Sequence, residues 1–146
     1  MKKIIVTGGC GFIGFSLSKK LLGDKNIQII GIDIINDYYD VNLKKQRLKL
    51  LKENKIFYFK KIDIKNYNLL EKIFKNKKID IVYNLAAQAG VQYSIKNPKK
   101  YMDSNCVGFF NILELSRVNS IKKIFYASSS SVYGDSKKFP VKENFD

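Results

Sequence analysis

Hydrophobic residues fall into two alternating kinds of segment along the chain: short runs rich in Ile, Val and Phe, and longer stretches with apolar residues three and four positions apart. The short runs predict five β-strands, at residues 3–7, 27–32, 56–60, 79–85 and 123–128. The longer stretches predict four helices, at residues 12–22, 42–52, 67–74 and from Pro98 to about 119. Strands that alternate with helices form right-handed βαβ units, so the expected fold class is α/β, with a doubly wound parallel sheet of the Rossmann type.

The pattern predicts one domain over residues 1–146, without internal repeats or a linker. After Ser131 the chain carries Gly134, Pro140 and charged residues, and no further strand or helix is expected. The sheet is therefore expected to be incomplete at its carboxyl-terminal side, with an exposed edge and uncovered apolar surface at its last strand.

A glycine-rich segment, TGGCGFIG at residues 7–14, lies between the first predicted strand and the first predicted helix. It satisfies the dinucleotide-binding pattern G-x-G-x-x-G, in which glycines allow a tight turn, close approach of the backbone to a pyrophosphate, and close packing of helix on strand. The amide groups and the dipole at the start of the helix then hold the phosphates. The residues expected to bind the cofactor here are Gly8, Gly11, Phe12, Ile13 and Gly14.

Asp33 stands nineteen positions after Gly14, at the end of the second predicted strand. A carboxylate at this place accepts hydrogen bonds from the ribose hydroxyls of adenosine and repels a 2′-phosphate. With no arginine nearby, Asp33 favours NAD over NADP as the cofactor. The alternative is a carboxylate that only caps a turn.

Three further groups of residues are expected to contribute to the same cofactor site. Asp63 and Ile64 follow the third strand and suit an adenine pocket, in which the carboxylate reaches the exocyclic amine and the isoleucine packs on the ring. Small residues after the fourth strand let the cofactor lie against the backbone. These residues are Leu85, Ala86, Ala87 and Gln88. Asn105, a poor helix former within the last predicted helix, either hydrogen-bonds the loops around the cofactor or is a surface residue.

Four serines at residues 128–131 end the fifth predicted strand and precede a Val-Tyr-Gly motif. They place hydroxyls over the expected position of the nicotinamide, and Ser128 is expected to contact the cofactor. Because the chain has no histidine to activate a serine, hydrogen bonding to a substrate hydroxyl or a developing ketone is expected rather than a covalent nucleophile.

The composition excludes several other functions. The absence of histidine excludes a Cys/His zinc site and a Ser-His-Asp triad, and no metal is expected. The net charge of +14 comes almost entirely from lysines dispersed along the chain, which indicates solvated faces that attract nucleotides rather than a nucleic-acid-binding surface. No apolar run has the length of a membrane span or a signal peptide, and Cys10 and Cys106 are expected to be reduced thiols, so a cytoplasmic protein is expected.

Taken together, TGGCGFIG, Asp33, Asp63-Ile64, NLAAQAG and ASSSSVYG resemble the extended short-chain dehydrogenase/reductase superfamily in order and spacing across the whole chain. Residues 36–40 and 86–94, with Asn97-Pro98, are similar to the UDP-glucuronate 4-epimerase branch of the NAD-dependent epimerase/dehydratase family. The resemblance implies NAD as the cofactor, a nucleotide sugar as the substrate, and a homodimer in the full-length enzyme.

In such epimerases a tyrosine removes the proton of the sugar 4-hydroxyl as a hydride passes to NAD, and the ketone then rotates and takes the hydride back on its other face. The resemblance gives Ser129 a role in catalysis and in substrate binding, and places Ser130 beside the substrate. The catalytic tyrosine belongs to a YxxxK motif expected beyond Tyr133, which is part of the Val-Tyr-Gly motif. The chain is therefore expected to be the cofactor-binding half, without the sugar-nucleotide-binding region and inactive alone.

Two alternatives to a UDP-glucuronate 4-epimerase stay open. One is a non-catalytic NAD-binding module. The other is a 4,6-dehydratase or a decarboxylase on the same scaffold, although dehydratases prefer acidic residues where Ser130 and Ser131 stand. Gln92 stands where the epimerase branch usually has arginine, which leaves the exact sugar open.

Overall fold

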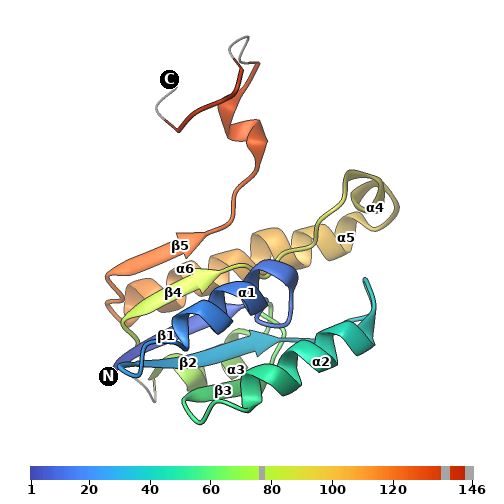
Figure 1. Cartoon of the computed structure of the whole chain (residues 1–146). Coiled ribbons are helices and arrows are strands. Elements are labelled where there is room, and N and C mark those ends of the chain that lie inside the picture. Colours follow the sequence, from blue (N-terminus) through green and yellow to red (C-terminus); the bar gives the residue numbers. More distant parts are fainter. Residues whose placement is uncertain (76–77, 136–138, 144–146) are drawn as a thin grey trace.

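The computed structural model describes residues 1–75, 78–135 and 139–143, which form one parallel β-sheet between two layers of helices (Figure 1). The strands are β1 (Lys2–Thr7), β2 (Ile27–Asp33), β3 (Phe57–Lys61), β4 (Ile81–Asn84) and β5 (Lys123–Tyr126). They lie in the order β3-β2-β1-β4-β5, and all neighbouring pairs are parallel. The chain thus builds outward from β1 on both sides, which confirms the predicted doubly wound sheet.

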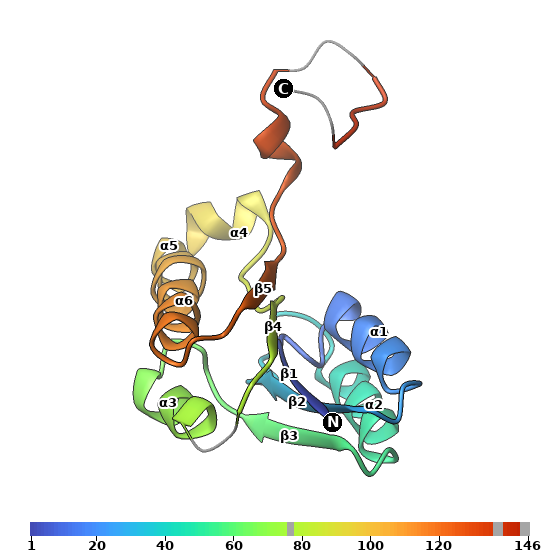
Figure 2. The same cartoon turned by 90° about the vertical axis from the view of Figure 1, so that its left-hand side faces the viewer.

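Helices cover both faces of the sheet. They are α1 (Phe12–Leu21), α2 (Val41–Lys52), α3 (Tyr67–Lys75), α4 (Val91–Lys96), α5 (Pro98–Tyr101) and α6 (Phe109–Val118), with a π-helical segment η1 (Met102–Gly108) and a 3-10 turn η2 (Ser130–Tyr133). Figure 2 shows α1 and α2 on one face and α3 and α6 on the other. None of the helices in the described part of the chain is long and apolar enough to cross a membrane.

The β-branched runs form strands because they are buried on both faces. In β1, Ile4 packs in a cluster with Leu51 of α2, whereas the next residue, Ile5, packs with Leu70 of α3 and Leu115 of α6. Complete burial of an aliphatic side chain stabilises a fold by about 1.5–3 kcal/mol. The two helical layers are therefore held to the sheet by alternate residues of the same strands.

Two strands end earlier than the sequence predicts, and both ends lie at the same edge. β4 stops at Asn84 because the N–H of Leu85 donates to Oγ1 of Thr7 (3.1 Å) rather than to a strand carbonyl. β5 stops at Tyr126, opposite Asn84, and the Asn84 carbonyl accepts a last bond from Ala127 N–H (3.2 Å). The other boundaries of the predicted elements differ by no more than two residues.

Two short elements, α4 and η2, were not predicted, since one turn of helix is too short to show a period in the sequence. The helix predicted from Pro98 onward is continuous through α5, η1 and α6, but its middle is π-helical.

At the opposite edge from β3, Phe125 and Tyr126 of β5 are 49% and 59% exposed. The predicted uncovered apolar edge is confirmed there, and residues 127–135 extend away from the layers (Figures 1 and 2).

Candidate functional site

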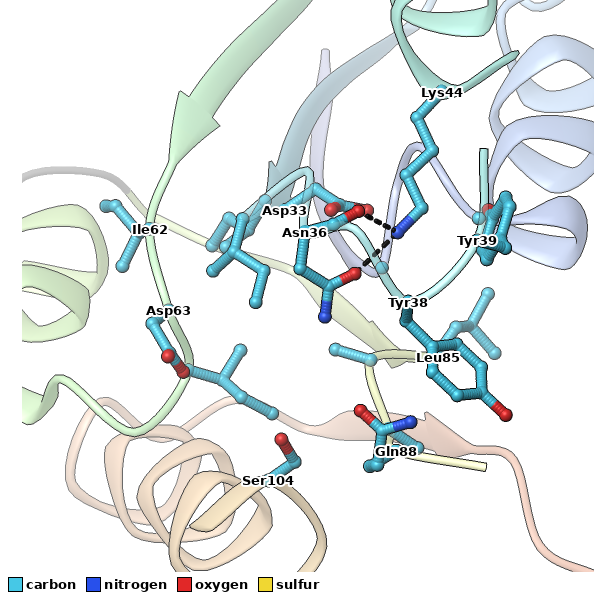
Figure 3. A pocket seen from close by; sticks show the side chains of 17 residues that line it. Asp33, Asn36, Tyr38, Tyr39, Lys44, Ile62, Asp63, Leu85, Gln88 and Ser104 are labelled. Atoms are coloured by element: carbon cyan, nitrogen blue, oxygen red, sulfur yellow. Dashed lines mark hydrogen bonds between the residues drawn. The ribbon is translucent and has the colours of Figure 1, made fainter. Parts of the chain in front are cut away.

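A cleft opens at the carboxyl ends of the strands, where the order of the sheet changes direction beside β1. It encloses about 670 Å³, part of it open to solvent, and Figure 3 shows the side chains around it. The lining residues are Gly8, Gly11, Ile32, Asp33, Ile34, Asn36, Tyr38, Tyr39, Lys44, Ile62, Asp63, Ile64, Leu85, Ala86, Ala87, Gln88 and Ser104. Most of the predicted cofactor residues are therefore brought together in one place. The predicted residues that do not line it are Phe12, Ile13, Gly14, Asn105 and Ser128.

Thr7, the last residue of β1, joins β1 to the chain that leaves β4. Its buried hydroxyl donates to Oδ1 of Asn84 (2.7 Å) and accepts from the N–H groups of Leu85 (3.1 Å) and Ala86 (3.0 Å). The hydroxyl thus fixes the direction in which the small residues after β4 enter the cleft. In the sequence, Thr7 is only the first residue of the glycine-rich segment, and no local signal indicates this role.

The glycines of the motif are needed for close packing. Gly8 has φ of +66°, and a Cβ on it would lie 2.8 Å from the carbonyl carbon of Leu85. A Cβ on Gly11 would lie 3.0 Å from the carbonyl oxygen of Gly8, and a Cβ on Gly14 would overlap with that same oxygen. The loop therefore folds back tightly between the end of β4 and the start of α1, and any side chain at Gly14 would displace it.

Among the described residues, no side chain caps the amino-terminal end of α1. Gly11 precedes the helix without a side-chain hydrogen bond, and no acidic residue stands in the first turn. The first N–H groups of a helix lack intrahelical partners and lie at the positive end of its dipole. The side chains of Phe12 and Ile13 are 72% and 58% exposed, and neither residue lines the cleft beside Gly11. Such a helix end suits a phosphate.

Asp33 caps a turn, as one of the two alternatives considered from the sequence has it, and it also faces the cleft. Its Oδ2 accepts from Cys10 N–H (2.9 Å) and its Oδ1 from Ile35 N–H (2.8 Å), so it caps the turn after β2 and holds the glycine loop. It also lines the cleft. Because each carboxylate oxygen has a second acceptor position, the same group can bind the two hydroxyls of a ribose.

The wall beside Asp33 carries a lysine that the sequence analysis did not single out. Lys44 of α2 is buried, and its Nζ donates to the carbonyl oxygen (2.8 Å) and to Oδ1 (2.6 Å) of Asn36. The same Nζ lies 4.1 Å from the ring centroid of Tyr39. Burial lowers the pKa of Lys44, and the negative charge of Asp33 opposes that shift. In Figure 3 the amine points into the space between Asp33 and Asn36.

An arginine also lies close to the glycine loop, although its hydrogen-bond partners are Cys10 and Tyr39 and not Asp33. Arg47 stands fourteen positions after Asp33, but α2 brings its guanidinium back toward the start of α1. It donates to the hydroxyl of Tyr39 (3.1 Å) and to the carbonyl of Cys10 (3.4 Å). Helix direction, rather than sequence distance, decides this contact.

The far end of the cleft is formed by the turn after β3. Oδ1 of Asp63 accepts from Lys65 N–H (3.1 Å), and Oδ2 lies 3.5 Å from Lys65 Nζ. Ile64 is buried, and its carbonyl accepts from Nδ2 of Asn111 (3.0 Å). This end of the cleft therefore combines an apolar wall with a carboxylate.

Asn105 holds the loop after β4 from the π-helical segment η1. Its Oδ1 accepts from Gln88 N–H (2.8 Å), and its Nδ2 donates to the Gln88 carbonyl (2.9 Å). Of the two alternatives, the structure shows the contact with a cleft loop. Asn105 therefore acts on the cleft through Gln88. Its position in a π-helical segment fits this role, because π-helical turns often occur at functional sites.

The predicted catalytic and substrate-binding serines lie apart from the cleft. Ser128, Ser129 and Ser130 are exposed, and none of them lines it. Oγ of Ser129 accepts from Ser131 N–H (3.1 Å) and caps η2. The segment begins beside the end of β4 but then extends away from the sheet (Figure 2), so its contacts with cofactor and substrate stay a prediction.

Cys10, inside the glycine loop, is a packing residue. Burial, helped by the charge of Asp33, raises the pKa of the thiol to about 12, so the group is protonated at neutral pH. In the described ranges, no group of three or more His, Cys, Asp or Glu side chains is placed to hold a metal ion. The cleft lining therefore combines the backbone of the glycine loop with two carboxylates, Asp33 and Asp63, and apolar side chains such as Ile64.

Comparisons with known proteins agree with this geometry. Residues 5–146 match the family described as GDP-mannose 4,6 dehydratase. Protein CapI of Staphylococcus aureus is 54% identical over 99% of this chain and 43% of its own length. A UDP-glucuronate 4-epimerase of Thermodesulfobacterium geofontis is 45% identical over 88% of this chain and 40% of its own length.

Among solved structures, the UDP-glucuronic acid 4-epimerase of Bacillus cereus, in complex with UDP-glucuronic acid and NAD, superposes with a TM-score of 0.86. It is 35% identical, and the match covers 98% of this chain and 45% of the Bacillus chain. The chain therefore spans less than half the length of these relatives.

Proposed function

This chain belongs to the GDP-mannose 4,6 dehydratase family, and from that membership we propose that it is the NAD-binding part of a nucleotide-sugar 4-epimerase acting on UDP-glucuronate or a close relative. The relatives from Thermodesulfobacterium and Bacillus, both UDP-glucuronate 4-epimerases, support this activity within the family. The observation that carries the proposal is the cleft that Gly8, Gly11 and Asp33 line together, with Gly11 standing directly before α1.

The residues present fit NAD. Gly8, Gly11 and Gly14 allow the tight loop in which a Cβ would strike the backbone of Leu85 or Gly8, and this loop brings its backbone to the cleft. The N–H groups of Phe12 and Ile13 are the proposed donors to the diphosphate at the positive end of α1. The chemistry that NAD supplies when bound is to accept a hydride from the sugar carbon and later to return it to that carbon.

The rest of the cleft fits the adenosine and the nicotinamide side of the cofactor. Asp33 holds the adenosine ribose, while Asp63 and Ile64 hold the adenine. The backbone of residues 85–88 lies under the remainder, kept in place by Thr7 and Asn105.

Catalysis needs residues that this span does not bring to the cleft. Ser129 is proposed to hydrogen-bond the reacting sugar hydroxyl, with Ser130 beside the substrate. Tyr133 has a lysine four positions later, Lys137, but Tyr133 ends a single 3-10 turn and residue 137 lies outside the described residues. The chain alone is therefore proposed to bind NAD without epimerising a nucleotide sugar.

The full-length protein is proposed to be a cytoplasmic homodimer. Apolar side chains remain exposed on the helical layer that carries α3 and α6, where Leu69 is 40%, Phe110 62% and Leu113 39% exposed. Packing of this layer against a second copy would cover them. Sedimentation at several concentrations tests this: a single monomeric species at all of them would refute it.

A direct test of cofactor binding is a titration of the chain with NADH, followed by fluorescence. Wild type is expected to bind, and Asp33→Arg to lose binding, because the ribose loses its acceptor. Asp135→Arg makes the same change of charge outside the cleft and is the control. Equal affinities of Asp33→Arg and wild type would refute the role of Asp33.

The reaction is tested on the protein extended by the region that its relatives carry beyond this span. Conversion of UDP-glucuronate into its C4 epimer, followed by NMR, is the expected outcome. Release of carbon dioxide would instead identify a decarboxylase. Loss of water from a nucleotide hexose would identify a dehydratase, for which Ser130 and Ser131 replace the acidic residues such enzymes prefer.

A further inference from the structure

The π-helical segment η1 and the turn after β3 meet at the end of the cleft that is proposed to hold the adenine. Asp63 of that turn and Ser104 of η1 both line this end (Figure 3). Ile64 lines it too, yet Ile64 is only 5% exposed. Most of the Ile64 side chain is therefore covered by other parts of the protein, and its place in the wall of the cleft depends on them.

Gly108, the last residue of η1, provides the space into which Ile64 packs. Its φ of −62° and ψ of −43° are ordinary right-handed helical values, which any residue adopts. Glycine is also a poor residue for a helix interior, second only to proline. A Cβ on Gly108 would lie 2.5 Å from Cγ1 and 2.6 Å from Cδ1 of Ile64. The missing side chain at Gly108 therefore serves the close approach of Ile64 to the helix.

Asn111, three positions further along and within α6, holds the backbone of the same isoleucine. Its side chain is buried, and Nδ2 donates to the carbonyl oxygen of Ile64 (3.0 Å). A buried carbonyl that lost this donor would be left without its partner, which is costly. Gly108 thus sets the position of the Ile64 side chain, and Asn111 sets the position of its backbone.

Ion pairs between the same two segments contribute less. Nζ of Lys65 lies 3.5 Å from Oδ2 of Asp63 and 3.8 Å from Oδ2 of Asp103, but the Lys65 side chain is 51% exposed. Exposed ion pairs are weak because water and salt screen them. The buried contacts of Gly108 and Asn111 are therefore the ones that hold the turn against the helix.

We propose that Gly108 and Asn111 are positioning residues that set the place of Ile64 against the base, and thereby determine how well the cleft distinguishes adenine from other bases. Neither residue lines the cleft, so both act through Ile64. The neighbouring Asp63 can accept from the exocyclic amine of adenine only while Ile64 holds the ring at the right place. This inference rests on the proposed binding of NAD, with its adenine at Asp63 and Ile64.

The test compares the dissociation constants of NADH and of its analogue in which hypoxanthine replaces adenine. Hypoxanthine has a carbonyl oxygen where adenine has the amine, so the analogue loses the hydrogen bond to Asp63. Wild type is expected to bind NADH roughly 10-fold more tightly than the analogue. The rest of the two ligands is identical, so general damage to the cleft weakens both and leaves the ratio of their affinities unchanged.

Two variants are expected to lower this ratio. Gly108→Ala pushes Ile64 away from the helix, and Asn111→Ala releases its backbone. In each, the preference for NADH is expected to fall to roughly 3-fold or less, because the amine no longer meets Asp63 squarely. Cys106→Ala changes an exposed residue of the same segment and is the control, with the ratio of wild type.

A second measurement isolates the contact between Gly108 and Ile64. Ile64→Ala removes both carbon atoms that a Cβ at position 108 would strike. Gly108→Ala is therefore expected to lower the midpoint of urea unfolding in the wild-type chain but not in the Ile64→Ala chain. Equal destabilisation in both chains would overturn the packing on which the inference depends.

The outcomes for ligand binding separate the two proposals. If wild type binds neither ligand, the proposed function fails. If wild type binds NADH but does not prefer it to the analogue, the base is not recognised at Asp63 and this inference is overturned. It is also overturned if Asn111→Ala keeps the ratio of wild type, and this variant decides the question alone should Gly108→Ala not fold.

Discussion

The hydroxyl of Tyr38 donates a hydrogen bond of 2.8 Å to the carbonyl of Ala89, joining the loop after β2 to the loop after β4 across the cleft. The ring of Tyr38 also meets that of Tyr93 edge-on, with centroids 4.9 Å apart. From the other side, the hydroxyl of Tyr101 donates to the carbonyl of Gly90 (2.8 Å). Both loops that line the cleft are thus held at a fixed separation by tyrosine hydroxyls.

Loss of the Tyr38 hydroxyl is expected to loosen this connection without disturbing the core. Tyr38→Phe keeps the ring contact with Tyr93 but removes the bond to Ala89, which is worth about 0.5–1.5 kcal/mol. Stopped-flow measurement of NADH release is expected to show a dissociation rate roughly 2- to 10-fold faster, which is the factor that a loss of this energy corresponds to. Tyr58→Phe, on β3 and outside the cleft lining, is the control. Unchanged release from Tyr38→Phe would show that the bond does not restrain the loops.

Gly14→Ala is expected to damage both stability and NADH binding. The added Cβ overlaps with the carbonyl oxygen of Gly8, so the loop or α1 must move. A forced shift of this kind costs about 1–3 kcal/mol, measurable by urea unfolding. Gly23→Ala adds the same methyl group where its contact with Lys20 carbonyl oxygen is 3.3 Å, and is the comparison. Equal stability of the two variants would contradict the packing described for the motif.

Ser18→Ala is expected to stabilise the protein. The hydroxyl of Ser18 is buried in α1 and has no hydrogen-bond partner in the described part of the chain. Removing an unsatisfied buried hydroxyl, and replacing serine by the best helix former, should raise the free energy of unfolding by about 1 kcal/mol. Ser16→Ala is the matched control, since Ser16 is an exposed residue of the same helix that bonds to the Phe12 carbonyl (2.9 Å). A loss of stability in Ser18→Ala would mean that the hydroxyl has a partner in solution.

The two cysteines are expected to differ in reactivity. Burial raises the pKa of Cys10 to about 12, whereas Cys106 is exposed. At pH 8 a thiol reagent should therefore modify Cys106 within minutes and Cys10 only after unfolding. Mass spectrometry of the labelled peptides gives the site. Rapid labelling of Cys10 in the folded chain would show that the glycine loop opens readily.

The same shift makes stability depend on pH. The folded state favours the protonated Cys10 thiol, since its pKa is about 12 rather than 9.0. The resulting stabilisation is complete below about pH 9 and is lost as pH rises toward 12, because the unfolded chain ionises first. Between pH 8 and pH 10.5, wild type should lose more unfolding free energy than Cys10→Ala. Parallel losses in the two proteins would argue against this origin.

Asn105→Ala is expected to weaken NADH binding more than it weakens the fold. The change removes two hydrogen bonds to the Gln88 backbone, each worth about 0.5–1.5 kcal/mol, from a loop that lines the cleft. Calorimetry of NADH binding and thermal unfolding measure the two effects. Asn68→Ala, in α3 and away from the cleft lining, controls for the loss of an amide. An unchanged affinity would show that Gln88 holds its place without Asn105.

The sheet and the glycine loop could be predicted because their signals are local. β-branched runs such as residues 27–32 and the motif at residues 7–14 each lie within one short segment, and the structure places them as expected. Asp33 was found for the same reason, because its distance from the motif is set by one helix and one strand.

The contacts that complete the cleft could not be predicted, since they join distant segments. Thr7 meets Asn84 across 77 positions, and Arg47 meets Cys10 across 37. Such pairs depend on strand order and on the rotation of α2 about its axis, neither of which the periodicity of a single helix specifies. The serines at residues 128–131 show the opposite case. Their motif is clear in the sequence, but the structure places these serines apart from the cleft.

All residues that line the cleft lie between Gly8 and Ser104, while β5 and the serine motif come later in the chain. During synthesis the complete lining of the nucleotide cleft is therefore made before β5, although α6 must still pack behind Ile64. A nascent chain that folds from its amino terminus would meet its cofactor early, and a bound dinucleotide would stabilise β1 to β4 while the remaining strand is added.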